Sequence, residues 1–174
     1  MSFAEAGSTK PPDTFAAVVE AHWTAVYTLL YSLAGNRHDS EDLTQETFLR
    51  ALNRWDSFKA GTNLRAWLLR IATNAFLDLK RKAQIRKMTP LPDELPGPTT
   101  PADSPLELAE QGELIRIAMQ ELTELTRLVF HLRVTEELSF REIADLAGTS
   151  EEAARWHMHQ ARSKLLKRLG DSFT

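Results

Sequence analysis

The 174-residue sequence contains no cysteine, which excludes disulfide bridges and thiolate metal sites. It also lacks an uninterrupted apolar run of the roughly 20 residues needed to cross a bilayer, because charged residues interrupt every hydrophobic segment. Residues 1–10 have neither the basic start nor the apolar stretch of a secretory signal peptide. We therefore expect a cytoplasmic protein that does not insert into a membrane and contacts one only through a partner.

Sequence motifs of enzymes are missing as well. There is no HExxH, no ExxH pair, no glycine-rich phosphate loop and no GxSxG. His157 and His159 are two residues apart, so their side chains diverge on a helix. Paired acids such as Glu41 and Asp42 stand at helix ends, where capping or solvation explains them. The sequence predicts no catalytic group, no metal site and no cofactor.

Proline is absent from most of the chain. The eight prolines are Pro11, Pro12 and six residues between 90 and 105. Proline removes a backbone donor and fixes φ, so residues 90–105 cannot form a helix interior or a central strand. We interpret 90–105 as a linker between two units, residues 1–89 and 106–174. Fully extended, about 16 residues at roughly 3.3 Å each would span on the order of 50 Å.

Charge is strongly segregated although the formal net charge is only −3. Residues 54–87 hold nine basic and two acidic side chains, whereas residues 93–124 hold eight acidic and one basic. Five further basic residues lie between 155 and 168. Such alternation suggests two nucleic-acid surfaces separated by an acidic segment, because attraction to phosphate dominates non-specific affinity. Ordinary solvated helix faces are the alternative interpretation.

Outside the linker, apolar residues recur at three- and four-residue steps, which predicts an all-α protein of two small helical domains. We expect helices over about 12–34, from a cap at Asp39 onward, 63–87, 106–121, 124–135 and 150–169. The predicted inward residues of the first domain are Phe15, Val18, Val19, His22, Val26, Leu29, Leu30, Leu33, Leu43, Phe48, Leu52, Trp55, Leu64, Trp67, Leu68, Ile71, Ala75 and Leu79.

The second domain carries the pattern of a helix-turn-helix. Ser139 and Glu142 form a capping box, Ala144 allows two helices to approach closely, and Gly148 suits the left-handed turn between them. Ser150 then caps the last helix. Residues near the start of such a helix reach base edges in the major groove, and later cations contact phosphates. The outward stripe of this helix is Glu152, Arg155, His159 and Arg162. The predicted base-reading residues are Glu151, Glu152, Arg155, Trp156 and His159. An exposed helix of a protein-binding module would look similar.

A second candidate surface lies between Trp55 and the basic run from Lys80 to Lys82. Aromatic side chains stack on unpaired bases while cations follow the phosphate backbone, so this mixture suits single-stranded DNA. Phe58 is the preferred aromatic residue of the loop. Trp55, Phe58 and Trp67, taken singly, are more often core residues than platforms for bases.

From about residue 15 to 169 the sequence resembles the extracytoplasmic-function RNA polymerase sigma factors of the sigma-70 family. Residues 39–48, DSEDLTQETF, are similar to the family's region that grips the clamp helices of the largest polymerase subunit. Trp67-Leu68, Ile71-Ala72, Asn74, Asp78 and Arg81 match the following region, which recognises and opens the minus-ten element. The order of these signatures, then a proline-rich linker and a helix-turn-helix, is highly specific.

The resemblance implies a transcription initiation factor that binds core RNA polymerase and promoter DNA and has no catalytic role. It places Asp39, Asp42, Gln45 and Glu46 on the polymerase and Phe58, Asn74, Lys80 and Arg81 on the minus-ten element. It also implies that the acidic linker follows the RNA exit path. The second domain would read the minus-thirty-five element and rest on the flap of the second-largest subunit. A separate anti-sigma factor is the implied regulator.

One departure from the family concerns the last helix. Where the family often has Lys-Ser-Arg-Leu-His-Arg, this chain has residues 155–160, RWHMHQ, preceded by Glu151 and Glu152. We therefore expect a distinctive upstream element. Two other functions stay open on the sequence: a stand-alone helix-turn-helix regulator, and an adaptor that binds polymerase without opening DNA.

Overall fold

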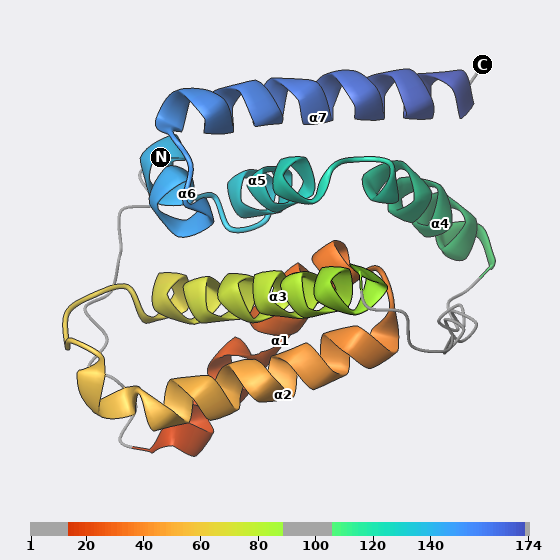
Figure 1. Ribbon diagram of the computed structural model, residues 1–174. Helices are drawn as coiled ribbons and strands as arrows, with labels where there is room; N and C mark the ends of the chain where they lie inside the picture. Colours follow the sequence, from red (N-terminus) through yellow and green to blue (C-terminus); the bar gives the residue numbers. More distant parts are fainter. Residues whose placement is uncertain (1–13, 89–105, 173–174) are drawn as a thin grey trace.

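The computed structural model of the chain describes residues 14–88 and 106–172. Within these residues the chain is helical, with no strand. The helices are α1 Phe15–Ala34, α2 Arg37–Asn53, the short 3-10 helix η1 Trp55–Ser57, α3 Leu64–Met88, α4 Leu106–Gln120, α5 Glu124–Val134, α6 Phe140–Ala147 and α7 Glu151–Ser172. They form two layers, with α1, α2 and α3 in one and α4 to α7 in the other (Figure 1). The predicted all-α class with two helical units is confirmed, whereas the predicted linker lies outside the described residues.

The turn between α1 and α2 depends on Gly35 and Asn36. Gly35 ends α1 in the left-handed conformation at φ 76°, where a side chain would be strained. The Asn36 side chain accepts a hydrogen bond from the Asp39 amide at 2.9 Å, so α2 starts at Arg37. The prediction that Asp39 caps α2 is therefore wrong. The Asp39 carboxylate instead accepts from Asn36 Nδ2 at 2.8 Å.

The core of the first layer follows the predicted stripes with two exceptions. Leu52 is 50% exposed and Leu79 is 37% exposed, although both were expected to face inward. On α2 the buried face runs through Thr47, Phe48 and Ala51, so the next position, Leu52, points outward. The buried side chains of this layer are Val18, Val26, Leu29, Leu30, Leu33, Leu43, Phe48, Ala51, Leu68, Leu69, Ile71, Ala72, Ala75 and Phe76.

The helix-turn-helix is built as the sequence predicts. Ser139 Oγ accepts from the Glu142 amide at 3.2 Å, and the Glu142 carboxylate accepts from the Ser139 amide at 2.8 Å. Gly148 adopts φ 64° and ψ 37°, which turns the chain between α6 and α7. Ser150 Oγ then accepts from the Ala153 amide at 3.0 Å. These local bonds fix the relative placement of the two helices.

The two layers are packed together along a contact surface that we call the seam, where α1 and α3 meet α5 and α6. One apolar cluster continues across it and includes Leu29 and Leu68 from the first layer and Leu132 and Ile143 from the second. Figure 1 shows α6 beside the N-terminal end of α3. The seam thus places the surfaces of the two units in a fixed relation. No described helix combines the length and apolar character that membrane crossing requires.

Candidate polymerase and DNA interfaces

The exposed face of α2 brings together three of the four predicted partner-binding residues. Asp42, Gln45 and Glu46 are all exposed and recur at the spacing of one helix face. Leu49 is 61% exposed one turn further along. Asp39 is half-buried and engaged with Asn36, so it lies at the edge of this face. The face therefore combines carboxylates with an apolar side chain, which suits a partner helix that carries cations.

Arg50 ties this face to α3. Its guanidinium donates to Glu46 Oε1 at 2.9 Å and to Asp78 Oδ2 at 2.8 Å. The hydrogen bond from Arg50 lowers the pKa of Asp78 below its ordinary value, with burial acting in the opposite direction. Asp78 thus has a structural role between α2 and α3. The Arg50 contact also holds the Glu46 carboxylate in place.

An aromatic cluster stands before α3. Phe58 stacks on Trp55 with ring centroids 5.7 Å apart, and lies 5.1 Å from the Trp67 ring. Phe15 packs edge-on against Trp55 at 5.3 Å. All four rings are half-buried. Trp55 and Trp67 consequently support Phe58, in agreement with their interpretation as packing residues, and Phe58 keeps part of its ring accessible.

The exposed side of α3 continues from this cluster. Arg70, Asn74 and Arg81 are exposed at intervals of four and seven residues, so they share one helix face. Arg70 also lines a cleft of about 440 Å³ with Phe58 and Trp67. Arg70 is not among the predicted site residues, although its four-residue spacing from Asn74 already indicated a shared helix face. We name Phe58, Trp67, Arg70, Asn74 and Arg81 the strand surface.

Lys80, the remaining predicted minus-ten residue, is placed differently. Its Nζ lies 2.8 Å from Glu124 Oε1 of α5 and 5.5 Å from the centre of the Phe76 ring. The structure therefore separates Lys80 from the strand surface and sets it against the second layer. Arg81 is 3.6 Å from Asp78 and mostly exposed.

All six residues predicted for the last helix are exposed on α7, namely Glu151, Glu152, Arg155, Trp156, His159 and Arg162. Arg155 pairs with Glu151 and lies 4.7 Å from the centre of the Phe140 ring. Trp156 is 57% exposed. His157 points inward, with Nδ1 2.9 Å from Thr126 Oγ1, and burial lowers its pKa. The exposed residues form one face that can enter a groove of duplex DNA.

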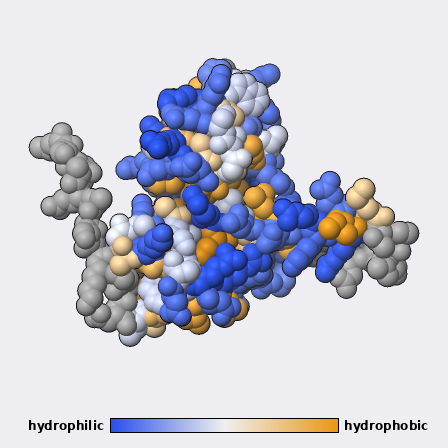
Figure 2. Space-filling model, turned by 60° about the vertical axis from the view of Figure 1, so that its left-hand side comes forward, coloured by the Kyte–Doolittle hydropathy of each residue, from blue (hydrophilic) through white to orange (hydrophobic). Residues whose placement is uncertain are grey.

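Neither a metal cluster nor one large apolar patch marks these surfaces. Among the described residues, no group of three or more histidines or acids could hold a metal ion. Figure 2 shows a largely hydrophilic face on which hydrophobic residues form separate spots. The interfaces are therefore polar surfaces with single exposed apolar or aromatic side chains, which is typical of nucleic-acid and transient protein contacts.

Comparison with known families gives two matches in chain order. Sigma-70 region 2 matches residues 18–85, and Sigma-70 region 4 matches residues 113–165. The first match contains the α2 face and the strand surface. The second contains the helix-turn-helix. Together they span both layers of the fold.

Curated relatives extend this similarity. The ECF RNA polymerase sigma factor SigW of Bacillus subtilis is 31% identical over 170 residues, covering 91% of this chain and 90% of SigW. SigE of Mycolicibacterium smegmatis, also an ECF sigma factor, is 34% identical over 151 residues. That alignment covers 85% of this chain but 58% of SigE, so the chain spans little more than half of that relative.

Solved structures show the same fold. CnrH, solved in complex with the cytosolic domain of CnrY, is 27% identical with a TM-score of 0.64, over 92% of this chain and 89% of CnrH. The sigma factor RpoE of Bartonella quintana, solved with the anti-sigma factor NepR, has a TM-score of 0.71 at 24% identity. That match covers 90% of this chain and 96% of RpoE. Both matches extend across the two layers.

Proposed function

We propose a division of roles among the surfaces of this chain, which belongs to the extracytoplasmic-function (ECF) RNA polymerase sigma factors of the sigma-70 family. Members of this family are transcription initiation factors, and this chain directs RNA polymerase to promoters. The observation that carries the assignment is the pair of region 2 and region 4 matches in this order. In the proposed division, each surface serves a different step of initiation.

The α2 face is the proposed contact with core polymerase. Asp42, Gln45 and Glu46 would meet the clamp helices of the largest subunit, with Leu49 as an apolar contact beside them. Arg50 supports this role because it holds the Glu46 carboxylate in place before binding. A preformed contact loses less side-chain entropy on association.

The strand surface is the proposed site for the melted minus-ten element. Phe58 would stack on an extruded base, Asn74 would hydrogen-bond another, and Arg70 and Arg81 would follow the phosphates. Stacking on an aromatic residue is worth roughly 1–3 kcal/mol per base, comparable with the unstacking cost of a few kcal/mol per flipped nucleotide. Binding energy can therefore capture the open state without ATP.

The exposed face of α7 is the proposed reader of the minus-thirty-five element, with the second domain resting on the flap of the second-largest subunit. Arg155 and Trp156 lie near the start of the helix, where side chains reach base edges. We further propose that the linker, residues 90–105, follows the RNA exit path. A separate anti-sigma factor is the proposed regulator, since CnrH and RpoE were each solved with a bound partner protein.

Reconstituted transcription tests this division. Core polymerase with this chain should start transcripts at specific sites, which sequencing of the RNA would identify. Glu46→Lys should weaken binding to core polymerase, and Glu20→Lys, the same charge change at an exposed position of α1, should not. Asn74→Ala should reduce permanganate reactivity of the minus-ten region while leaving core binding intact. Equal losses in both assays for Glu46→Lys and Asn74→Ala would contradict the assignment.

The same assay separates the other functions considered. A stand-alone regulator would bind an operator tightly without polymerase, and an adaptor would bind polymerase but leave the minus-ten region unreactive to permanganate. The Sigma-70 region 2 match over α1 to α3 favours neither the stand-alone regulator nor the adaptor. Failure of purified core polymerase to bind the chain would contradict the proposal.

A further inference from the structure

The ring of Phe140 lies against two arginine side chains in the second layer. Phe140 is the first residue of α6. The guanidinium carbon of Arg155 on α7 lies over the ring, 4.7 Å from its centre, and that of Arg133 on α5 lies 4.9 Å from it. A cation within about 6 Å of an aromatic ring centre is attracted by the negative face of the ring. Side chains of three helices thus meet at one aromatic residue.

The surroundings of Phe140 hold its ring in one place. The side chain is half-buried and packs against the apolar cluster of the core. Its backbone follows the Ser139 cap, which is locked by the capping box with Glu142. Arg133 donates to the Leu138 carbonyl at 2.8 Å, so this guanidinium is anchored as well. The ring is therefore a fixed support for the second arginine, Arg155.

Arg155 is restrained at two points although its side chain is 59% exposed. Its Nη2 donates to Glu151, one turn earlier on α7, and its guanidinium lies over Phe140. Among the described residues, its Nε and Nη1 have no hydrogen-bond partner. A guanidinium has five N–H donors, so most of the donors of Arg155 can serve a ligand. Because the side chain is already ordered, it loses less entropy when it binds.

Such restraint suits a contact with a base more than a contact with a phosphate. Arg155 is close to the start of α7, where side chains of a helix-turn-helix reach base edges. Arginine can donate two parallel hydrogen bonds to O6 and N7 of guanine, and this geometry requires a defined guanidinium plane. A phosphate contact can be made by a flexible point charge. Phe140 and Glu151 supply the defined orientation that guanine recognition needs.

We infer that Phe140 is a positioning residue for upstream promoter recognition: with Glu151, it holds the Arg155 guanidinium so that Arg155 reads a guanine in the minus-thirty-five element. The inference rests on the proposed role of the exposed face of α7 as the reader of that element. It adds the base that is read and a residue outside α7 that controls the preference.

Promoter selection with reconstituted polymerase tests the inference. The probe is duplex promoter DNA with a randomised minus-thirty-five region, bound by core polymerase with this chain or a variant. The wild-type chain should select guanine at one position, and Arg155→Ala should lose that selection. Phe140→Leu keeps an apolar side chain but removes the ring, so it should lower the guanine preference at that position by at least about threefold. Phe140→Tyr keeps the ring and should retain the preference.

Two controls separate positioning from a general effect on the fold. Phe130→Leu makes the same change at another half-buried phenylalanine that packs against the core, and it should keep the guanine preference. The double variant Phe140→Leu/Arg155→Ala should select the same sequences as Arg155→Ala, because Phe140 acts through Arg155. An intact guanine preference in Phe140→Leu, or an equal loss of it in Phe130→Leu, would overturn the inference.

The same selections distinguish failure of this inference from failure of the proposed function. If Arg155→Ala loses preference for a base other than guanine, the inference is overturned and α7 remains the reader. If Arg155→Ala weakens the binding of all sequences alike, Arg155 contacts phosphate and the inference is again overturned. If polymerase with the wild-type chain selects no base in the randomised region, the proposed role of α7 is overturned together with the inference.

Discussion

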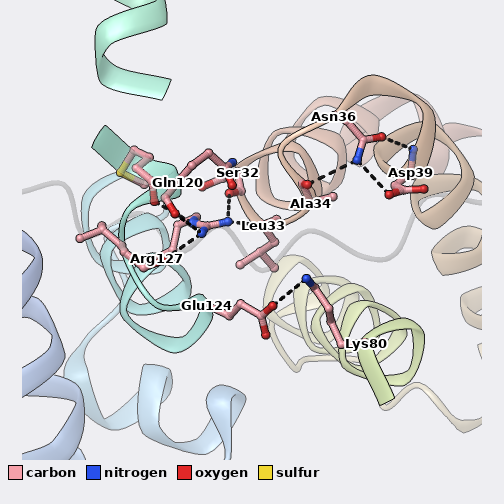
Figure 3. A network of polar contacts seen from close by, with 11 residues as sticks. Ser32, Leu33, Ala34, Asn36, Asp39, Lys80, Gln120, Glu124 and Arg127 are labelled. Atoms are coloured by element: carbon pink, nitrogen blue, oxygen red, sulfur yellow. Dashed lines mark hydrogen bonds and ion pairs between the residues drawn. The ribbon is translucent and has the colours of Figure 1, made fainter. Parts of the chain in front are cut away.

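Arg127 of α5 donates a hydrogen bond to the Leu33 carbonyl at the end of α1, so the two layers are joined by a buried cation as well as by apolar packing. Burial lowers the pKa of Arg127, as desolvation disfavours the charged form. Five backbone carbonyls compensate the desolvated guanidinium. The contact favours one relative arrangement of the two layers (Figure 3), because the planar guanidinium of Arg127 must donate to several carbonyls at the same time.

Replacing the Arg127 guanidinium is therefore expected to lower the free energy of unfolding. Arg127→Lys keeps the charge but cannot reach all of these carbonyls, so we predict a loss of about 2–4 kcal/mol in the free energy of unfolding. Arg133→Lys is the control on the same helix, since Arg133 donates to the Leu138 carbonyl within the second layer. Urea unfolding measures both variants, and equal losses would contradict the special role of Arg127.

Gly148 is expected to be required for its left-handed backbone conformation and not for lack of space around it. A Cβ at this position would meet no atom within 4 Å, yet φ is +64°. Gly148→Ala should therefore cost about 1 kcal/mol of stability from backbone strain. Gly112→Ala, inside α4 and equally free of neighbours, should instead stabilise by about 0.5–1 kcal/mol. Thermal unfolding that shifts in the same direction for both variants would contradict this reasoning.

The seam is expected to weaken in acid. His131 of α5 is 5% exposed, and its Nε2 lies 3.9 Å from Glu136 Oε1 without a hydrogen bond. His22 of α1 and Arg65 of α3 face the same group of charges. Burial lowers the pKa of both histidines, with Arg65 acting in the same direction and Glu136 in the opposite one.

Because these histidines bind protons more weakly in the folded state, protonation favours unfolding. Stability should be constant above the ordinary histidine pKa of about 6.5 and should fall as pH drops through the lowered values. His131→Gln should reduce this slope, because it removes one of the buried histidines whose pKa is lowered by burial. Urea unfolding at several pH values between about 5 and 8 provides the measurement.

Leu49 is expected to contribute to polymerase binding without supporting the fold. Burying a leucine on association is worth about 1.5–3 kcal/mol, so Leu49→Ser should weaken core binding by roughly tenfold or more. Leu166→Ser serves as control, since Leu166 is 74% exposed on α7. Labelled core polymerase in a fluorescence titration would measure both. Unchanged affinity for Leu49→Ser would remove it from the interface.

Arg155 and Arg162 are expected to differ in what they read. Arg155→Ala should change which upstream sequences are selected, because it lies near the start of α7 where side chains reach base edges. Arg162→Ala should weaken binding of all sequences alike, as loss of a phosphate contact does. Selection from randomised upstream DNA with reconstituted polymerase distinguishes the two. A shared change in sequence preference would contradict this division.

The helix-turn-helix was predictable almost residue by residue because its signals are local. Ser139, Glu142 and Gly148 each act within four residues, so the sequence around them contains the whole interaction. The same logic failed at α2, where Asp39 looked like a cap and Asn36 takes that role. Asn36 and Asp39 are both residue types that cap helices. The sequence alone does not show which of two such residues, three positions apart, accepts hydrogen bonds from the free backbone amides.

The seam could not be predicted because its residues look ordinary in the sequence. Arg127 and Glu136 are single charges on or near a helix, a pattern that usually indicates solvent exposure. Their burial depends on contacts with α1 and α3, about 70 to 95 residues away. Leu52 and Leu79 were misplaced because apolar spacing alone does not show where the buried face of a helix ends, and both side chains are exposed.

The continuous apolar cluster across the two layers also determines how the chain should lose its structure. Two units with separate cores unfold independently. In this chain Leu68 of the first layer and Leu132 of the second belong to one buried cluster, so the two layers share a core. Calorimetric and van't Hoff enthalpies should therefore agree for the intact chain, as for one cooperative transition. A sigma factor organised in this way behaves as a single thermodynamic body until a partner divides it.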